Sequence, residues 1–168
     1  MSYALAAMSR KVDFTTDNDP GADKDYDDET ENLTAFSVSG KYAFENGNDL
    51  KFMYTTGNPG RYLALGTWED AYVDGSDLKA LDVDGWYIAY KHKWNSKWRS
   101  NFVYAASEAD NPLDGDSTES IYNANINLIY SPTPKMSLGA EYVTGEKELK
   151  NGDDGDATRV QFTAKYAW

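Results

Sequence analysis

The chain has 168 residues, of which 40% are hydrophobic and 14% aromatic, and this length and composition suit one folded domain. Its formal net charge of −12 argues against a general affinity for nucleic-acid phosphates, and the absence of cysteine excludes disulfides, thiolate metal sites and thiol nucleophiles. No apolar run approaches the roughly 20 residues of a spanning helix, which excludes a helical membrane protein but leaves a membrane barrel open.

The N-terminal stretch SYALAAMSRK begins the first predicted strand and is too short and too early-charged for a signal peptide. We therefore expect that any export signal has been removed or was never present. Strands are predicted where Tyr, Val, Ile, Phe and Thr alternate with polar residues. The first strand has apolar residues in both registers, so its faces stay unassigned. In chain order the eight predicted strands cover residues 3–14, 33–45, 50–57, 84–95, 98–108, 121–132, 136–147 and 157–168.

The sixth strand shows the alternation clearly. Asn123, Asn125 and Asn127 share one face, and larger apolar residues share the other. In a dry core each of these amides would need a buried hydrogen-bond partner, so they favour a wet or polar interior. The closing strand likewise places Val160 opposite Arg159. The polar faces together give the predicted inward-facing residues, which would be pore-lining if the strands enclose a pore: Lys41, Lys51, Lys91, Arg99, Asn123, Asn125, Asn127 and Arg159.

The connections alternate between short and long. Tight turns rich in Asn, Gly, Ser and Pro follow the second, fourth and sixth strands. The other connections are long, at about 17–32, 58–83, 109–120 and 148–156. This alternation is typical of an outer-membrane barrel with short periplasmic turns and longer extracellular loops, and it places both termini on the short-turn side.

Charge and aromatic residues follow the same division. The long connections and their adjoining strand ends hold 24 of the 28 acidic residues, whereas 12 of the 16 lysines and arginines lie elsewhere. Aromatic residues gather near strand ends, where membrane barrels carry interfacial girdles. The predicted membrane-interface aromatics are Tyr42, Phe44, Trp94, Trp98, Tyr130 and Trp168.

These patterns predict an all-β fold, an antiparallel up-and-down transmembrane β-barrel that occupies residues 1–168. A soluble β-sandwich or lipocalin-like barrel would show the same alternation with its apolar faces turned inward. The girdle, the turn parity and the terminal aromatic strand favour the membrane. If the eight strands close on themselves, Glu45 and Glu141 share the inward parity with Lys41 and Arg159 and are placed to pair with them.

Several motifs resemble a known family. The stretch 123–168 contains NLIYSP, LGAEY followed by Gly145, NGDDGD and the closing RVQF…KY, and it resembles the C-terminal end of the DcaP-like trimeric porins of Gram-negative outer membranes. Upstream, GNPGRYL and WYIAYKHKWNSKWRSNFVYA are similar to the strand pattern of this family. The resemblance covers residues 33–168 well and the first strand loosely.

The end of the chain also resembles the signal that the outer-membrane barrel-assembly machinery reads. Phe162, Tyr166 and Trp168 fit that signal, whereas Thr163 stands where glycine is common. We therefore expect the assembly machinery to be a partner of this chain.

The resemblance implies an integral outer-membrane porin, without cofactors, that passes small anionic solutes such as dicarboxylates by passive diffusion. It also implies a homotrimer in contact with outer-membrane lipid and lipopolysaccharide. Family members resemble a barrel of about twice as many strands with a helical N-terminal segment, so the chain would be half of a sixteen-strand porin barrel. The alternative is a small non-conducting eight-strand barrel, filled by its own side chains, that serves as a membrane anchor or surface-interaction protein.

No catalytic or metal site is predicted. His92 is the one histidine, and its parity places it outward between Tyr90 and Trp94, away from any pocket that a catalytic triad would need. The acidic run at 19–31 and NGDDGD at 151–156 offer oxygen ligands but lack EF-hand spacing, which favours solvated loops. We therefore expect a protein that is not an enzyme.

Overall fold

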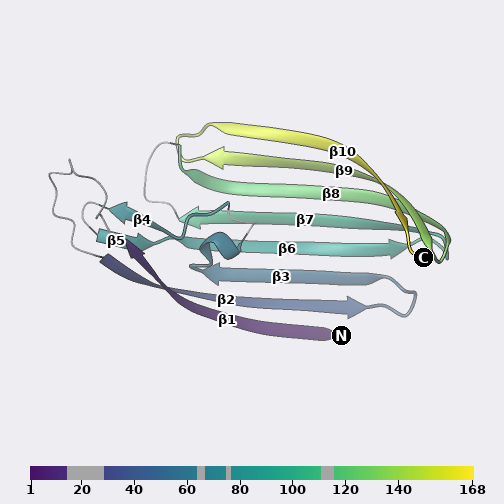
Figure 1. The fold of residues 1–168 in the computed structure, drawn as a ribbon, viewed down its shortest axis with the longest axis horizontal. Coiled ribbons are helices and arrows are strands. Elements are labelled where there is room, and N and C mark those ends of the chain that lie inside the picture. The colour runs from purple at the N-terminus through teal and green to yellow at the C-terminus, as the bar shows by residue number, and fades with distance from the viewer. Residues whose placement is uncertain (15–28, 64–66, 75–76, 111–115) are drawn as a thin grey trace.

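A computed structural model describes residues 1–14, 29–63, 67–74, 77–110 and 116–168. It contains an eight-stranded antiparallel sheet in the order β1-β2-β3-β6-β7-β8-β9-β10 and a separate pair, β4-β5 (Figure 1). The element bounds are β1 (Ser2–Phe14), β2 (Glu29–Ala43), β3 (Asp49–Gly57), the 3-10 helix η1 (Gly60–Tyr62), β4 (Ala71–Asp74), β5 (Asp77–Ala80), β6 (Asp82–Lys93), β7 (Trp98–Asp110), β8 (Thr118–Thr133), β9 (Met136–Leu149) and β10 (Asp154–Tyr166).

All eight predicted strands are present, and most of them extend further toward the long connections than the sequence predicted. Strand β2 begins at Glu29, which pairs with Phe14 at the end of β1, and β6 begins at Asp82, which pairs with Asp110. Ladder hydrogen bonds to a neighbour extend a strand through polar residues that alternation alone assigns to a loop. Many acidic residues assigned to the connections therefore lie on paired strand ends.

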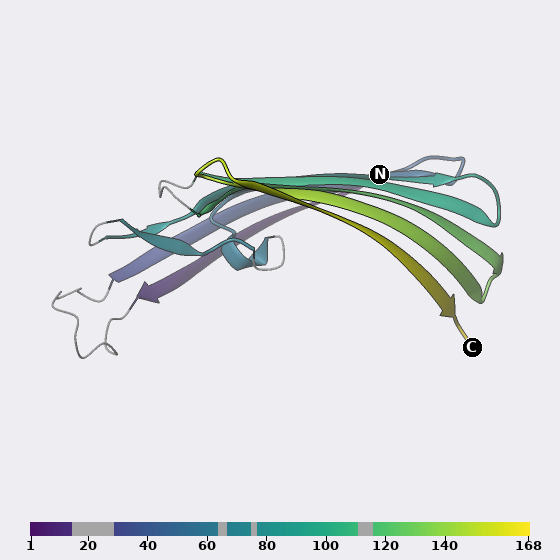
Figure 2. The same ribbon diagram turned by 90° about the horizontal axis from the view of Figure 1, so that it is seen from above.

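The sheet is curved into a trough, and η1 lies on its concave side (Figure 2). Strands β1 and β10 form its two edges and do not pair with each other among the described residues. The described strands therefore form an open curved sheet, and not the closed eight-strand barrel of the alternative prediction. Among the residues that the structure describes, no helix has the length and apolarity needed to cross a membrane.

The two faces of the sheet differ in chemistry. Large apolar side chains lie exposed on the convex face, including Phe36, Ile88, Ile126 and Phe162. The register also settles β1, which the sequence left unassigned: Leu5 faces outward opposite Val38. The apolar convex surface is therefore continuous from one edge strand to the other.

The long connection between β3 and β6 contains structure that the sequence did not predict. It includes η1, β4 and β5, and we call its described residues, 58–63, 67–74 and 77–81, the inner segment. The inner segment folds over the concave face, where Leu63 packs above Gly85 of β6. A buried cluster joins the inner segment to β6 and β7 and consists of Leu63, Trp68, Leu81, Val83 and Ala109.

Candidate functional site

A row of polar side chains crosses the concave face near its short-turn end. Directly paired positions in six neighbouring strands, β3 and β6 to β10, each contribute one side chain. The sequence predicted polar inward positions within each strand, but their alignment into one row depends on strand register. This polar row consists of Asp49, Lys91, Asn101, Asn127, Glu141 and Gln161.

The acidic end of the polar row is Asp49, whose side chain is 7% exposed. It forms ion pairs with Lys91 and Lys41, the latter with 3.7 Å between Nζ and Oδ2. Lys51 lies opposite Lys41 in register, so the carboxylate offsets repulsion within a cluster of lysines. In the structure the counterion of Lys41 is Asp49 rather than Glu45. Asp49 opens a strand directly after a tight turn, and nothing in the sequence pattern singled it out.

Amides occupy the middle of the polar row. The side chain of Asn101 donates to Asn127 Oδ1 at 2.9 Å, and the side chain of Asn127 donates to Glu141 Oε2 at 3.2 Å. Asn123 is exposed, and Asn125 is half-buried with its Oδ1 unpartnered in the described structure. By register all three predicted asparagines face the concave side, where Asn123 is open to solvent and Asn127 has polar partners.

The two predicted arginines take different positions on the concave face. Arg99 is half-buried on β7, and its Nη1 donates to Ser131 Oγ at 3.3 Å. Arg159 is exposed on β10, opposite Val143, and forms no ion pair within the described part of the chain. All eight predicted pore-lining residues thus share the concave face, and their role in conduction stays a prediction.

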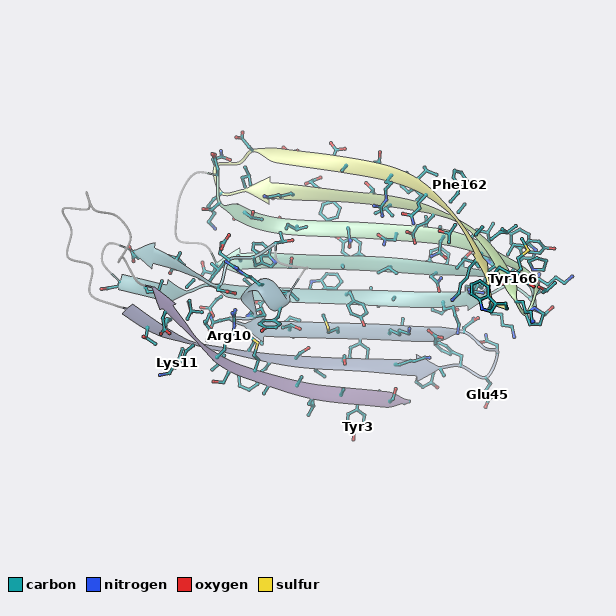
Figure 3. All side chains as sticks on the ribbon, in the orientation of Figure 1. Tyr3, Arg10, Lys11, Glu45, Phe162 and Tyr166 are labelled. Carbon is teal, nitrogen blue, oxygen red and sulfur yellow. The ribbon has the colours of Figure 1, made fainter. Side chains whose placement is uncertain are left out.

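The inner segment is held by a cluster of charges at the opposite, long-connection end of the sheet. Asp70 forms ion pairs with Arg10 of β1 and with Arg61, the latter at 3.5 Å between Nε and Oδ2. The backbone N–H of Arg61 also donates to Asp70 Oδ1 at 3.0 Å. Arg10 lies 5.2 Å from the centre of the Tyr62 ring, a cation–π distance. Figure 3 shows Arg10 where β1 passes beneath η1.

Asp70 carries a shifted pKa. The hydrogen bond from Arg10 lowers the pKa of this carboxyl below its ordinary value, and partial burial opposes that effect without reversing it. The backbone hydrogen bond from Arg61 adds to the lowering. Asp70 is therefore ionised over the whole neutral range and keeps its two arginine partners there.

The predicted interface aromatics form a belt on the convex face beside the tight turns. Trp98 stacks on Tyr130 with 4.5 Å between ring centroids, and Tyr42 meets Phe44 edge-on at 4.8 Å. Trp168 lies beyond the end of β10 and is almost fully exposed. Their placement at the lipid–water interface stays a prediction that suits the amphipathic character of Tyr and Trp.

A second belt near the long connections was not predicted. Trp86 and Tyr104 lie 5.4 Å apart between centroids, and Tyr104 stacks on Tyr122 at 6.0 Å. The hydroxyl of Tyr122 donates to Glu146, its partner in register, and that of Tyr54 donates to Asp84, which lies nearer the long-connection end. The rings of this second belt come from three neighbouring strands, at sequence positions that are staggered from one strand to the next. The alternation pattern of a single strand therefore did not reveal the belt.

The two belts bracket an apolar band. Trp86 and Trp94 are eight residues apart, or about 26 Å along the strand at about 3.3 Å per residue. Strand tilt shortens this to the order of 20 Å, comparable with the roughly 25 Å apolar band of outer-membrane barrels. The convex face therefore has the dimensions of a lipid-facing surface.

His92 lies on the convex face within the short-turn belt. Its ring is 4.1 Å from that of Trp94, and its Nδ1 lies 3.5 Å from both Asn48 Nδ2 and Tyr90 Oη. No group of three or more His, Asp or Glu able to hold a metal occurs in the described ranges. The predicted acidic run at 19–31 lies mostly outside those ranges.

Comparisons with known proteins agree on one family. The model of a family described as DcaP outer membrane protein matches residues 14–168. The crystal structure of the outer membrane channel DcaP of Acinetobacter baumannii superposes with a TM-score of 0.80 at 18% identity, covering 99% of this chain and 54% of that channel. This chain therefore spans about half the length of the solved channel. No curated protein matches the sequence.

Proposed function

The chain belongs to the DcaP outer membrane protein family, and from that premise we propose that it forms part of the wall of a porin that passes small anionic solutes. It is an integral protein of the outer membrane. The proposed transport is passive diffusion along the concave face, which would line the lumen. Small dicarboxylates are the proposed solutes.

The difference between the two faces of the same strands carries this proposal. In β8, Ile126 and Leu128 are exposed on the convex face, whereas Asn127 between them joins the polar row. A soluble barrel would bury its apolar face, whereas the apolar convex face of the described sheet is uncovered and only part of the concave face is covered, by the inner segment. Lipid on one side and water on the other satisfy both faces.

Anion preference is proposed from the cations of the concave face. Lys51 and Arg159 have no ion pair within the described part of the chain, and the field of such groups along a low-dielectric wall concentrates anions. Polar amides beside them would replace part of the hydration shell of a passing solute. No catalytic role is proposed for His92, which lies on the lipid side among aromatic rings.

Further partners are proposed from the family and the surface. The convex face would contact outer-membrane lipid and lipopolysaccharide, and a homotrimer would cover part of it. The barrel-assembly machinery would insert the protein. Since the chain spans about half of the solved channel, we propose that further strands complete the barrel beside β1 and β10, whose edges cannot stay unpaired in lipid.

Single-channel recording tests the proposal. The protein that contains this chain would be purified in detergent, inserted into a planar bilayer and recorded under a salt gradient, with detergent alone as the control. We expect stable conductance steps and a reversal potential on the anion-selective side. A folded protein that inserts without conducting would overturn the channel proposal, and a cation-selective reversal potential would overturn the anion preference.

A further inference from the structure

Two hollows adjoin each other at the short-turn end of the concave face. One has a volume of about 420 Å³ and lies over β7 to β10, and the other has about 340 Å³ and lies over the turn between β6 and β7. Arg99 lines both of them. By the rule that porin turns on this side are short, the hollows lie at the periplasmic mouth.

Cationic side chains outnumber acidic ones in both hollows. Four cations and no acidic residue line the smaller hollow, and three cations with Glu141 line the larger one. Only Lys91 among these cations has an ion pair in the described structure, with Asp49. The cations that surround the hollows are Lys91, Lys93, Lys97, Arg99, Lys135 and Lys165.

Arg99 is held in place at the boundary between the hollows. Its Nη1 donates to Ser131 Oγ, and Ser131 Oγ lies 2.9 Å from Ser137 Oγ. Ser131 lines the smaller hollow and Ser137 the larger one. A guanidinium has five N–H donors in a rigid fork, so this single side-chain hydrogen bond orients the fork and leaves donors for a ligand.

The larger hollow exists partly because position 139 carries no side chain. A Cβ at Gly139 would meet Ile129 Cγ1 at 3.6 Å, which is ordinary contact, and Gly139 itself lines the hollow. A larger side chain there would project into the space next to Arg99. A larger apolar side chain at position 139 would therefore fill the larger hollow without changing any charge.

The inner segment has the opposite electrostatic arrangement. Its cations are matched by acids, with Arg61 beside Glu69 and Asp70, and Lys79 beside Asp74. Charges that neutralise each other in pairs attract a passing anion only weakly. Most unpaired cations of the described concave face therefore lie at the mouth, and the exceptions are Lys147, at the long-connection end, and Arg159.

We propose that the periplasmic mouth is a binding site for a small dianion, with Arg99 contacting the ligand from the boundary of the two hollows. This inference rests on the proposed channel function and specifies where that channel would select its solute. A dianion gains from several cations at once, and a forked guanidinium binds a carboxylate or phosphate through two parallel hydrogen bonds. Two carboxylates on a short chain could occupy both hollows, whereas one phosphate could occupy a single hollow.

The test measures block of the open channel by added anions. The protein that contains this chain would be recorded in oriented insertions, with succinate, inorganic phosphate or the monoanion propionate added to one side at a time. We expect succinate to block more strongly from the short-turn side, and propionate to block weakly from either side. Phosphate that blocks as strongly as succinate would assign the site to single dianionic groups.

Three variants at the site and one control variant separate the site from the general charge of the lumen. Arg99→Gln should weaken succinate block by about tenfold or more, the size expected for a lost hydrogen bond to a charged group. Arg99→Lys keeps the charge and should recover only part of the block. Gly139→Leu keeps every charge and should weaken succinate block by filling the larger hollow, and Arg61→Gln, in the inner segment, is the matched charge control.

Each outcome decides one claim. Equal block from both sides, or equal loss in Arg99→Gln and Arg61→Gln, would overturn the mouth site while leaving the channel intact. If the wild-type protein does not conduct, isothermal titration of the detergent-solubilised protein with succinate tests the site alone. Binding that disappears in Arg99→Gln would then support the site, and absence of binding would overturn it. Circular dichroism melting confirms that each variant is folded.

Discussion

Trp68 and Ser107 are joined on the concave side of the sheet by a hydrogen bond of 3.1 Å from the indole Nε1–H to the hydroxyl oxygen. Trp68 belongs to the inner segment and is 2% exposed, and Ser107 belongs to β7. This bond fixes the polar edge of the one large aromatic ring that the described inner segment buries completely. The position of the segment over the concave face therefore depends on this residue.

Replacing this tryptophan should release the inner segment. Trp68→Ala removes a buried ring whose loss typically costs about 3–5 kcal/mol, whereas Ser107→Ala removes one hydrogen bond worth about 0.5–1.5 kcal/mol. We expect rapid proteolytic cleavage within the inner segment of Trp68→Ala, with the sheet intact, and a larger or noisier conductance. Equal protection of Trp68→Ala and wild type would contradict the anchoring role.

Two inward glycines should respond differently to the same substitution. A Cβ at Gly85 would lie 2.6 Å from Leu63 Cδ2, so Gly85→Ala must shift the Leu63 side chain and should loosen the packing of the inner segment. Gly139 has room for a Cβ, and Gly139→Ala should be neutral or stabilising, since glycine weakens a strand by about 0.5–1 kcal/mol. Thermal melting with inner-segment proteolysis would compare them, and a loss of protection in both variants would refute the steric argument.

The ion pairs of Asp70 predict how the inner segment responds to acid. Its pKa is lowered in the folded state, so the stabilisation is complete above the unfolded pKa of about 3.9 and is lost as the pH falls through the lower folded value. We expect the inner segment to resist proteolysis equally well at every pH from neutral down to about pH 4, and to become susceptible to proteolysis below that. Asp70→Asn should make the inner segment more susceptible to proteolysis at every pH above about 4, where the wild-type carboxyl is ionised, and a wild-type transition near pH 6 would contradict the assignment.

Neighbouring positions on β8 test which face meets lipid. Ile126→Lys places a charge in the middle of the apolar band and should destabilise the inserted protein by about 2–4 kcal/mol. Asn125→Lys places the same charge on the concave face and should be tolerated. Urea titration in lipid vesicles measures both, and comparable losses would argue against a lipid-facing convex surface.

Much of the architecture followed from the sequence. The alternation in each strand, the turn residues after the second, fourth and sixth strands, and the division of charge predicted eight antiparallel strands with one apolar and one polar face. These properties are local, because side chains of a strand alternate between faces whatever the partner strand is. The predicted pore-lining residues share one face for this reason.

The tertiary structure decided what lies next to what. Sequence alternation could not identify Asp49 as the counterion of two lysines, Trp68 as the anchor of the inner segment, or Arg99 as the boundary of two hollows. Each of these depends on register between strands or on the return of a long connection to the sheet. Because such contacts join residues far apart in the chain, they are fixed only when the strands pair and the connection packs.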